Sequence, residues 1–271
     1  MSEHSTTGGR AEAVPVSPEH VALRVENLKK AFGGLVAVDG ASFDVPEGSI
    51  TGIVGPNGAG KTTLFNLVAG ALPADDGRVL LNGNEIGHLS APERTREGLG
   101  RTFQTPRVFG GMTVIDNLRF AAINQTGESV TGAFFRPGTV ATEEAAITRR
   151  AEDVLSFLEI DHLDDAYASG LSGGQRKLLE IGRVLMLEPT VMLLDEPGAG
   201  VNPALTDRIV DRLHDINDDG TTIVLIEHDM QLVMNHCDQV VVLHNGSTLA
   251  AGGPELIQSD ERVMEVYLGG V

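Results

Sequence analysis

The sequence predicts an α/β protein with a mainly parallel sheet, an N-terminal antiparallel β subdomain and an inserted α-helical lobe. Three continuous apolar runs, SITGIVG, VMLLDEP and TTIVLIEHD, are typical of strands that are covered on both faces in a parallel sheet. Between Pro106 and Gly170 no such run occurs, and apolar residues recur at helical spacing instead. These two patterns indicate a parallel core that a helical segment interrupts.

The first folded segment, VALRVENLKKAFGGLVAVDGASFDVPEGS, shows the period-two alternation of antiparallel strands, broken by glycine pairs at tight turns. Residues 1–20 before it are polar and lack the apolar region of a signal peptide, so we expect a disordered tail. The folded domain is therefore predicted to span residues 21–271. Near its end, QVVVLHNGSTLAAG predicts a hairpin that turns at Asn245-Gly246.

The helical lobe is predicted at about residues 105–170. The segment TVIDNLRFAAI predicts a helix capped by Thr113. Residues 124–142, rich in Gly and Thr, predict a loop or insertion. A second helix is predicted over residues 143–159, because its apolar residues form one stripe. The stripe consists of Ile147, Ala151, Val154, Leu155 and Leu158.

Charge and composition limit the classes of partner. The chain has 38 Asp and Glu against 20 Lys and Arg, a net charge of −18, and this acidity opposes binding to nucleic acid because phosphate contacts need cations. Acidic surfaces also keep proteins hydrated at high salt, and we favour a halophilic source. The single cysteine, Cys237, excludes an internal disulfide, fits a reducing cytoplasm and is expected to be a buried apolar residue. No window approaches 18 consecutive apolar residues, so no membrane span is expected.

The run GPNGAGKTT matches the P-loop pattern G-x-x-x-x-G-K-[ST] and lies between a predicted strand and a predicted helix. The glycines let backbone N–H groups converge on a phosphate, and the helix N-terminus adds positive potential. Lys61 is predicted to reach the β- and γ-phosphates and Thr62 to bind Mg²⁺. The alternative, an ordinary glycine-rich turn, does not explain this context. The predicted nucleotide ligands are Gly55, Pro56, Asn57, Gly58, Ala59, Gly60, Lys61, Thr62 and Thr63.

The strand VMLLDEP delivers Asp195 to the carboxyl edge of the sheet, where it would bind Mg²⁺ through water. Glu196 follows directly and would orient or deprotonate an attacking water as a general base. Adjacent carboxylates can simply mark a solvated strand end. Here the apolar run and the P-loop upstream favour a metal site.

Two further polar residues are predicted to belong to the catalytic site. His228 follows the strand TTIVLIE, and as a neutral imidazole it could hydrogen-bond the γ-phosphate. Gln104, in GRTFQTPRVF, lies where the α/β core meets the helical lobe. Taken alone, each would be a surface side chain. Their positions relative to the other motifs favour a functional role.

The run LSGGQ, from Leu171 to Gln175, is a second candidate anion site. Ser172 and Gln175 have the spacing of a capping box for the helix QRKLLEIGRVLMLE. A capped helix start with two glycines, Gly173 and Gly174, also suits an anion, so the two interpretations agree. The local chemistry does not indicate whose phosphate it would bind.

Taken in this order, GPNGAGKTT, the junction glutamine, LSGGQ, VMLLDEP and the strand-terminal histidine resemble the ATP-binding subunit of an ABC transporter, from about Val21 to the C-terminus. The resemblance implies that ATP and Mg²⁺ bind between two copies arranged head to tail. The P-loop of one copy and Ser172, Gly173 and Gly174 of the other would hold the same γ-phosphate.

The same resemblance implies two further ligand contacts. Phe32, in KKAFGG, would stack on adenine, with packing in the core as the alternative. Gln104 would join Thr62 and Asp195 around Mg²⁺, in addition to its catalytic role.

A narrower resemblance concerns the transported substrate. GRTFQTPRVFGGMTVIDNL, LDEPGAGVNP, IEHDMQLVM and GGPELIQSDERVMEVYLGG are similar to ATPase subunits of branched-chain amino acid importers. Importers of urea and short amides share part of the C-terminal pattern. One departure is AGVN, residues 199–202, in place of the usual S-A-L-D type, so that Asn202 keeps a polar group at the dimer contact without a charge.

The resemblance implies a peripheral ATPase on the cytoplasmic face of the membrane. Its partners would be a second copy or a paralogue, transmembrane permease subunits and an extracytoplasmic substrate-binding protein. Gln104 and the segment Pro106–Asn117 would receive a permease helix. The apolar candidates for that contact, which could equally be lobe core, are Phe109, Met112, Phe134 and Phe135.

Three other classes share some of these motifs. ABC ATPases that act on DNA or ribosomes usually carry coiled coils or tandem ATPase domains, which this chain lacks. A P-loop kinase would not need LSGGQ. An exporter of a lipid-like substrate differs only in its partners.

Overall fold

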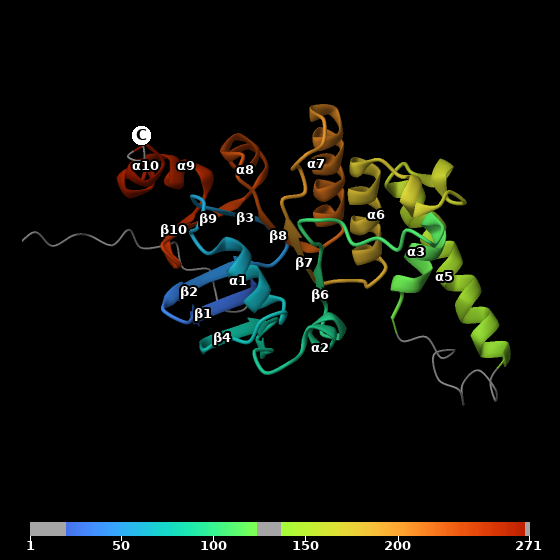
Figure 1. Ribbon diagram of the computed structural model, residues 1–271, viewed down its shortest axis with the longest axis horizontal. Coiled ribbons are helices and arrows are strands. Elements are labelled where there is room, and N and C mark those ends of the chain that lie inside the picture. Colours follow the sequence, from blue (N-terminus) through green and yellow to red (C-terminus); the bar gives the residue numbers. More distant parts are fainter. Residues whose placement is uncertain (1–19, 124–136, 269–271) are drawn as a thin grey trace, which may run out of the picture.

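Figure 1 shows the computed structural model of the chain, which describes residues 20–123 and 137–268. A six-stranded sheet has the order β10-β9-β3-β8-β7-β6. All its neighbouring strands run parallel except the hairpin β9–β10, which confirms the predicted parallel core and the turn at Asn245-Gly246. Its strands are β3 (Ile50–Val54), β6 (Leu99–Arg101), β7 (Val191–Asp195), β8 (Thr222–Ile226), β9 (Gln239–His244) and β10 (Ser247–Gly252).

A separate four-stranded antiparallel sheet has the order β2-β1-β4-β5. β1 (Val21–Phe32) and β2 (Leu35–Pro46) form the predicted antiparallel pair. β4 (Asp76–Leu81) and β5 (Asn84–Glu85) complete the sheet and were not predicted. The predicted tail lies outside the described residues apart from His20, whose carbonyl accepts a hydrogen bond from the Glu47 N–H.

The six-stranded sheet separates two apolar cores. All residues of β3, β7 and β8 are buried, and successive side chains alternate between the two cores, as the strand period requires. Helix α1 (Lys61–Val68) packs in the core shared with the antiparallel sheet. The helices α6 (Gly173–Leu185), α7 (Pro203–Asp218) and α8 (Met230–His236) pack in the other core.

The helical region lies beyond α6, at the right of Figure 1. It contains α3 (Val114–Ala121) and α5 (Pro137–Phe157). Thr113 caps α3, as predicted, by accepting the Asp116 N–H at 3.2 Å. The stripe predicted on the second helix is confirmed, since Ala151, Leu155 and Leu158 are buried.

The predicted loop over residues 124–142 is wrong in its last part, because α5 already begins at Pro137. Proline is favoured at the first position of a helix, where the missing N–H would have no intrahelical partner. Residues 124–136 lie outside the described residues. The domain division at about 105–170 stays a prediction.

Several short elements were not predicted, in addition to β4 and β5. They are β6, α2 (Ala91–Arg96), the 3₁₀ turns at Asp161–Leu163 and Ala168–Gly170, α8, α9 (Pro254–Ser259) and α10 (Glu261–Leu268), and the longer helix α7 was not predicted either. Among the described residues, no helix combines the length and the apolar character that crossing a bilayer requires.

A buried arginine fixes the end of α1. The side chain of Arg94 is 3% exposed, and it donates to the carbonyls of Leu67 and Val68 at 2.7 and 2.6 Å. It also donates to the carbonyls of Gly87 and Leu89 at 2.8 and 3.1 Å. The Leu67 carbonyl also accepts the Gly70 N–H at 3.2 Å, so Arg94 adds to the few donors that are available to the last carbonyls of α1.

We predict that Arg94→Met lowers the free energy of unfolding by about 3 kcal/mol, because it leaves several buried carbonyls unsatisfied. Denaturant titration would measure this change. Arg96→Met is the matched control, because Arg96 is exposed and lies on α2, the helix that also carries Arg94. Its free energy of unfolding should stay within about 0.5 kcal/mol of the wild type. Equal midpoints for both variants would contradict the anchoring role of Arg94.

Candidate functional site

The loop between β3 and α1 is shaped by glycines. Gly60 has φ +98°, and a Cβ there would lie 2.3 Å from the Ala37 carbonyl oxygen. A Cβ on Gly55 would lie equally close to the carbonyl oxygen of Leu243. In the described structure the start of α1 has no side-chain cap and no acidic residue in its first turn. Its N–H groups therefore suit a phosphate.

Lys61 lies across this loop. Its Nζ donates to the carbonyls of Gly55 at 2.6 Å and Pro56 at 3.1 Å. Burial lowers the pKa of Lys61, and the carboxylates of Glu196 and Asp195 oppose that shift. The ammonium is thus held between the loop and the acidic end of β7. Of the remaining loop residues, Ala59 is buried, Pro56 and Thr63 are half-buried, and the exposed ones are Asn57, Gly58 and Thr62.

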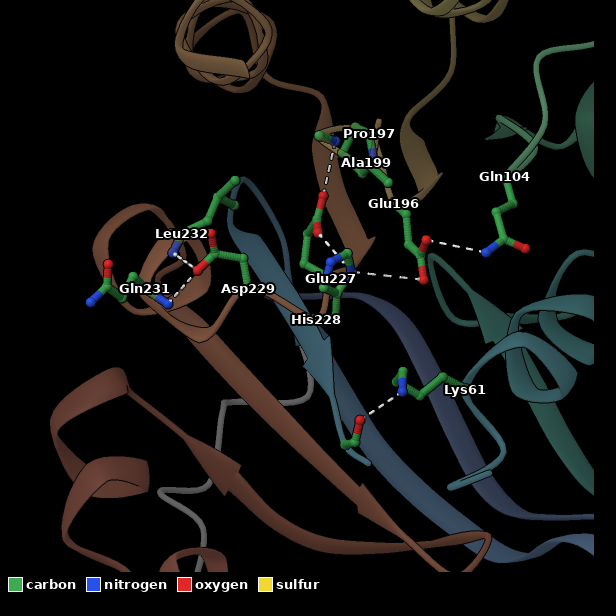
Figure 2. A network of polar contacts seen from close by, with 12 residues as sticks. Lys61, Gln104, Glu196, Pro197, Ala199, Glu227, His228, Asp229, Gln231 and Leu232 are labelled. Atoms are coloured by element: carbon green, nitrogen blue, oxygen red, sulfur yellow. Dashed lines mark hydrogen bonds and ion pairs between the residues drawn. The ribbon is translucent and has the colours of Figure 1, made fainter. Parts of the chain in front are cut away.

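Four neighbouring parallel strands place the other predicted residues at one edge of the sheet. β3, β6, β7 and β8 all end there, because the carboxyl ends of parallel strands share an edge. Figure 2 shows Gln104 and His228 approaching the carboxylate of Glu196 from opposite sides. Gln104 Nε2 donates to Glu196 Oε2 at 3.1 Å, and His228 Nδ1 lies 4.0 Å from Glu196 Oε1. The structure therefore brings Gln104, Glu196 and His228 together.

Asp195 is the last residue of β7 and is 4% exposed. Burial raises the pKa of Asp195, whereas the charge of Arg101, with Nη2 3.7 Å from Oδ2, opposes that shift. Its N–H donates to Thr102 Oγ1 at 3.3 Å. Its Oδ1 is buried and has no hydrogen-bond partner among the described residues. A buried carboxylate oxygen without a partner at a strand end fits a metal-bound water.

Glu196 has an uncommon backbone conformation, with φ +50°. Its N–H donates to the Ile226 carbonyl at 3.0 Å, and its own carbonyl accepts from Lys177 Nζ at 2.7 Å. The side chain is 22% exposed, so water can reach the carboxylate. A partly exposed carboxylate with a fixed backbone can accept a proton from a water molecule.

The turn after β8 fixes His228, whose side chain is 65% exposed. The carboxylate of Asp229 accepts the N–H groups of Gln231 and Leu232, which caps α8 (Figure 2). On the other side of His228, the buried Glu227 accepts the N–H of Gly198 at 3.0 Å. Burial raises the pKa of Glu227.

The predicted capping box at LSGGQ is confirmed. Ser172 Oγ accepts the Gln175 N–H at 3.3 Å, and Gln175 Oε1 accepts the Ser172 N–H at 2.9 Å. A Cβ on Gly174 would lie 1.9 Å from Leu205 of α7, so this glycine permits the close packing of α6 on α7. A Cβ on Gly173 would meet nothing within 4 Å. The start of α6 thus presents an open, exposed glycine.

Phe32 is the last residue of β1 and is 46% exposed, which excludes the alternative that it packs in the core of this chain. It pairs with Leu35 across the turn to β2, and that strand then places Ala37 against Gly60. The exposed ring therefore belongs to the hairpin that borders the P-loop.

Other predicted contact residues lie outside this cluster. Phe109 is 42% exposed and meets Phe120 edge to face at 5.0 Å, while Met112 is half-buried. Phe134 and Phe135 lie outside the described residues. The amide oxygen of Asn202 accepts the Leu205 N–H at 2.9 Å, so in this chain it caps α7.

Four residues in or beside the site were not predicted: Arg101, Lys177, Glu180 and Glu227. Arg101 faces the charge of Asp195, and the other three side chains bind backbone groups of distant segments. Glu180 lies on the buried face of α6, and Glu227 directly follows the apolar strand β8, so a charged residue in these two places could have drawn attention.

A family model described as ABC transporter matches residues 38–199. The chain is 42% identical over 251 residues to a protein of Methanocaldococcus jannaschii named probable branched-chain amino acid transport ATP-binding protein LivG, covering 91% of this chain and 97% of that one. It is 36% identical over 248 residues to the high-affinity branched-chain amino acid transport ATP-binding protein LivG of Escherichia coli, with coverage of 91% and 97%.

Solved structures give the same result. A nucleotide-free ATP-binding cassette from an ABC transporter superposes with a TM-score of 0.79 at 41% identity, covering 91% of this chain and 98% of that one. The ADP conformation of an ATP-binding cassette gives 0.76 at 38% identity, with coverage of 92% and 99%. The chain therefore belongs to the ABC transporter family, as an ATP-binding subunit whose ATP hydrolysis is coupled to transport.

Proposed function

We propose that this subunit drives the import of branched-chain amino acids. The names of the relatives at about 40% identity support this substrate class. An importer of urea or short amides is the alternative, because the transported molecule is selected by other subunits. The proposal places the chain on the cytoplasmic face of the membrane, with permease subunits and an extracytoplasmic substrate-binding protein as partners. The halophilic source stays a prediction.

The observation that carries the catalytic proposal is the convergence of Gln104 and His228 on Glu196, beside Lys61 (Figure 2). Lys61 and the N–H groups at the start of α1 would bind the phosphates. Thr62, Asp195 and Gln104 would hold Mg²⁺, which neutralises phosphate charge when bound. Glu196 would accept the proton of the attacking water, and His228 would hydrogen-bond the γ-phosphate. Phe32 would stack on adenine.

The second phosphate loop supports a site shared between two copies. The helices α1 and α6 pack on opposite faces of the six-stranded sheet, and each begins at one of the loops. We propose that Ser172, Gly173 and Gly174 of one copy, with Gln175 fixing the turn, complete the P-loop site of another. The second copy is identical or a paralogue.

Glu196→Gln should bind ATP, form a stable dimer and lose about 10²- to 10⁴-fold in turnover, because the amide keeps the shape of the carboxylate but cannot accept the proton. Phosphate release and light scattering in Mg-ATP would measure the two effects. Glu152→Gln, an exposed position on α5, is the control. Turnover near the wild type contradicts the base assignment, whereas a monomer in saturating Mg-ATP contradicts the shared site.

Two inactive variants should restore activity when mixed. Lys61→Ala removes the ammonium that would bind the phosphates. Gly173→Asp adds a negative charge that would repel the phosphate, at a position where a side chain meets no neighbour. A mixed dimer then has one site with both lesions and one intact site. We expect recovery of about a quarter of wild-type activity, since half of randomly formed dimers are mixed and each has one intact site of two. Absence of recovery would argue for a site completed within one chain.

Deletion of the gene in its source organism should abolish the uptake of labelled leucine, isoleucine and valine and leave urea uptake unchanged. The wild-type gene should restore uptake, and the Glu196→Gln gene should not. Loss of urea or amide uptake instead would favour the alternative importer.

A further inference from the structure

Lys177 forms an unusual contact between two parts of the site. It lies on α6, five residues after Ser172, and is one of only four lysines in the chain. Its Nζ donates to the carbonyls of Glu196 at 2.7 Å and Pro197 at 3.2 Å, and also to that of Ala199. All three donors of the ammonium are thus directed at one short segment, the loop 196–199.

The loop 196–199 has to be held, because Glu196 has φ +50°. Non-glycine residues rarely adopt this conformation, and it persists only where surrounding contacts fix it. The Ile226 carbonyl fixes the N–H of Glu196, and Glu227 fixes the N–H of Gly198. Lys177 fixes the carbonyl side of the same loop.

The charge of Lys177 also balances buried acids. Glu180, Asp195 and Glu227 are each 5% exposed or less, and burial raises the pKa of all three. Burial lowers the pKa of Lys177, and the charges of these carboxylates and of Glu196 oppose that shift. A neutral side chain at position 177 would leave the acidic groups without this cation.

Gln104, the hydrogen-bond partner of Glu196, is also held from helix α6. Glu180 lies one turn after Lys177, and its Oε1 accepts the N–H groups of Phe103 and Arg107 at 3.2 and 3.3 Å. These two residues flank Gln104. Helix α6 therefore fixes both backbone segments from which the Gln104–Glu196 hydrogen bond is made.

We propose that Lys177 is a positioning residue for ATP hydrolysis, which holds the loop 196–199 so that the Glu196 carboxylate stays in the reacting geometry. The proposal rests on the assignment of Glu196 as the general base. Because Lys177 is on the helix that begins at Ser172, it also links the second phosphate loop to that base.

Lys177→Met should lower kcat for ATP about 10- to 100-fold, as expected for displacement of a reacting group by about 1 Å. The KM for ATP should stay within about twofold of the wild type, because the P-loop contacts are unchanged. Lys29→Met, at an exposed position on β1, removes the same charge and should keep the wild-type kcat. An unchanged kcat for Lys177→Met would overturn the proposal.

Aminoethylation separates positioning from folding. Lys177→Cys should be as slow as the methionine variant, and alkylation with bromoethylamine, which forms a C–S bond and releases bromide, rebuilds a lysine-like ammonium there. Cys237 should not react, because it is 7% exposed and burial raises its pKa to about 12. Recovery of most of the lost kcat supports the proposal. No recovery in protein whose alkylation is verified by mass overturns it.

A double-mutant cycle tests whether Lys177 acts through Glu196. In the Glu196→Gln background, Lys177→Met should cause no further loss of turnover, whereas an additive loss would overturn the proposal. Near-wild-type turnover of Glu196→Gln alone would instead contradict the base assignment. The aminoethylation result would then show whether Lys177 supports turnover by another route.

Discussion

The parallel pairing of β3, β6, β7 and β8 is the constraint on which the rest of the structure depends. β3, β7 and β8 are short and fully buried, so their side chains alternate between two cores and cannot shift register by one residue without exchanging those cores. The fixed register fixes where each strand ends. Residues from segments more than a hundred positions apart in sequence, such as Lys61 and Glu196, therefore meet at one edge.

The sequence predicted the strands in which a continuous apolar run leads directly to a candidate site residue. Continuous apolar runs that end in Gly55, Asp195 or His228 identify both a buried strand and the residue that it delivers. The prediction failed where neither signal was strong, as in the three-residue β6 and in the first turn of α5, which begins at Pro137. It also missed Arg101, Lys177, Glu180 and Glu227, because their partners are backbone groups or charges that only the fold brings near.

These missed residues explain how acidic groups can be concentrated at the site. Asp195 and Glu227 are buried beside Glu196, and repulsion among them would oppose folding if they were not compensated. Arg101 and Lys177 supply positive charge from β6 and α6, and Lys61 supplies it from α1. In a chain with four lysines and a net charge of −18, two lysines are placed at this edge.

The two proposed phosphate loops differ in how the N–H groups at the starts of their helices are satisfied. At α1, Gly60 provides no side-chain cap, so the N–H groups are left for a ligand. At α6, Ser172 and Gln175 satisfy each other, which holds the turn rigid while Gly173 stays open to the outside. Because the turn is capped within the chain, its N–H groups stay satisfied when nothing is bound, which suits a surface proposed to contact a second copy. Through Lys177, the same helix also holds the backbone of Glu196, the proposed base, so contact at the start of α6 would bear on the geometry of that residue.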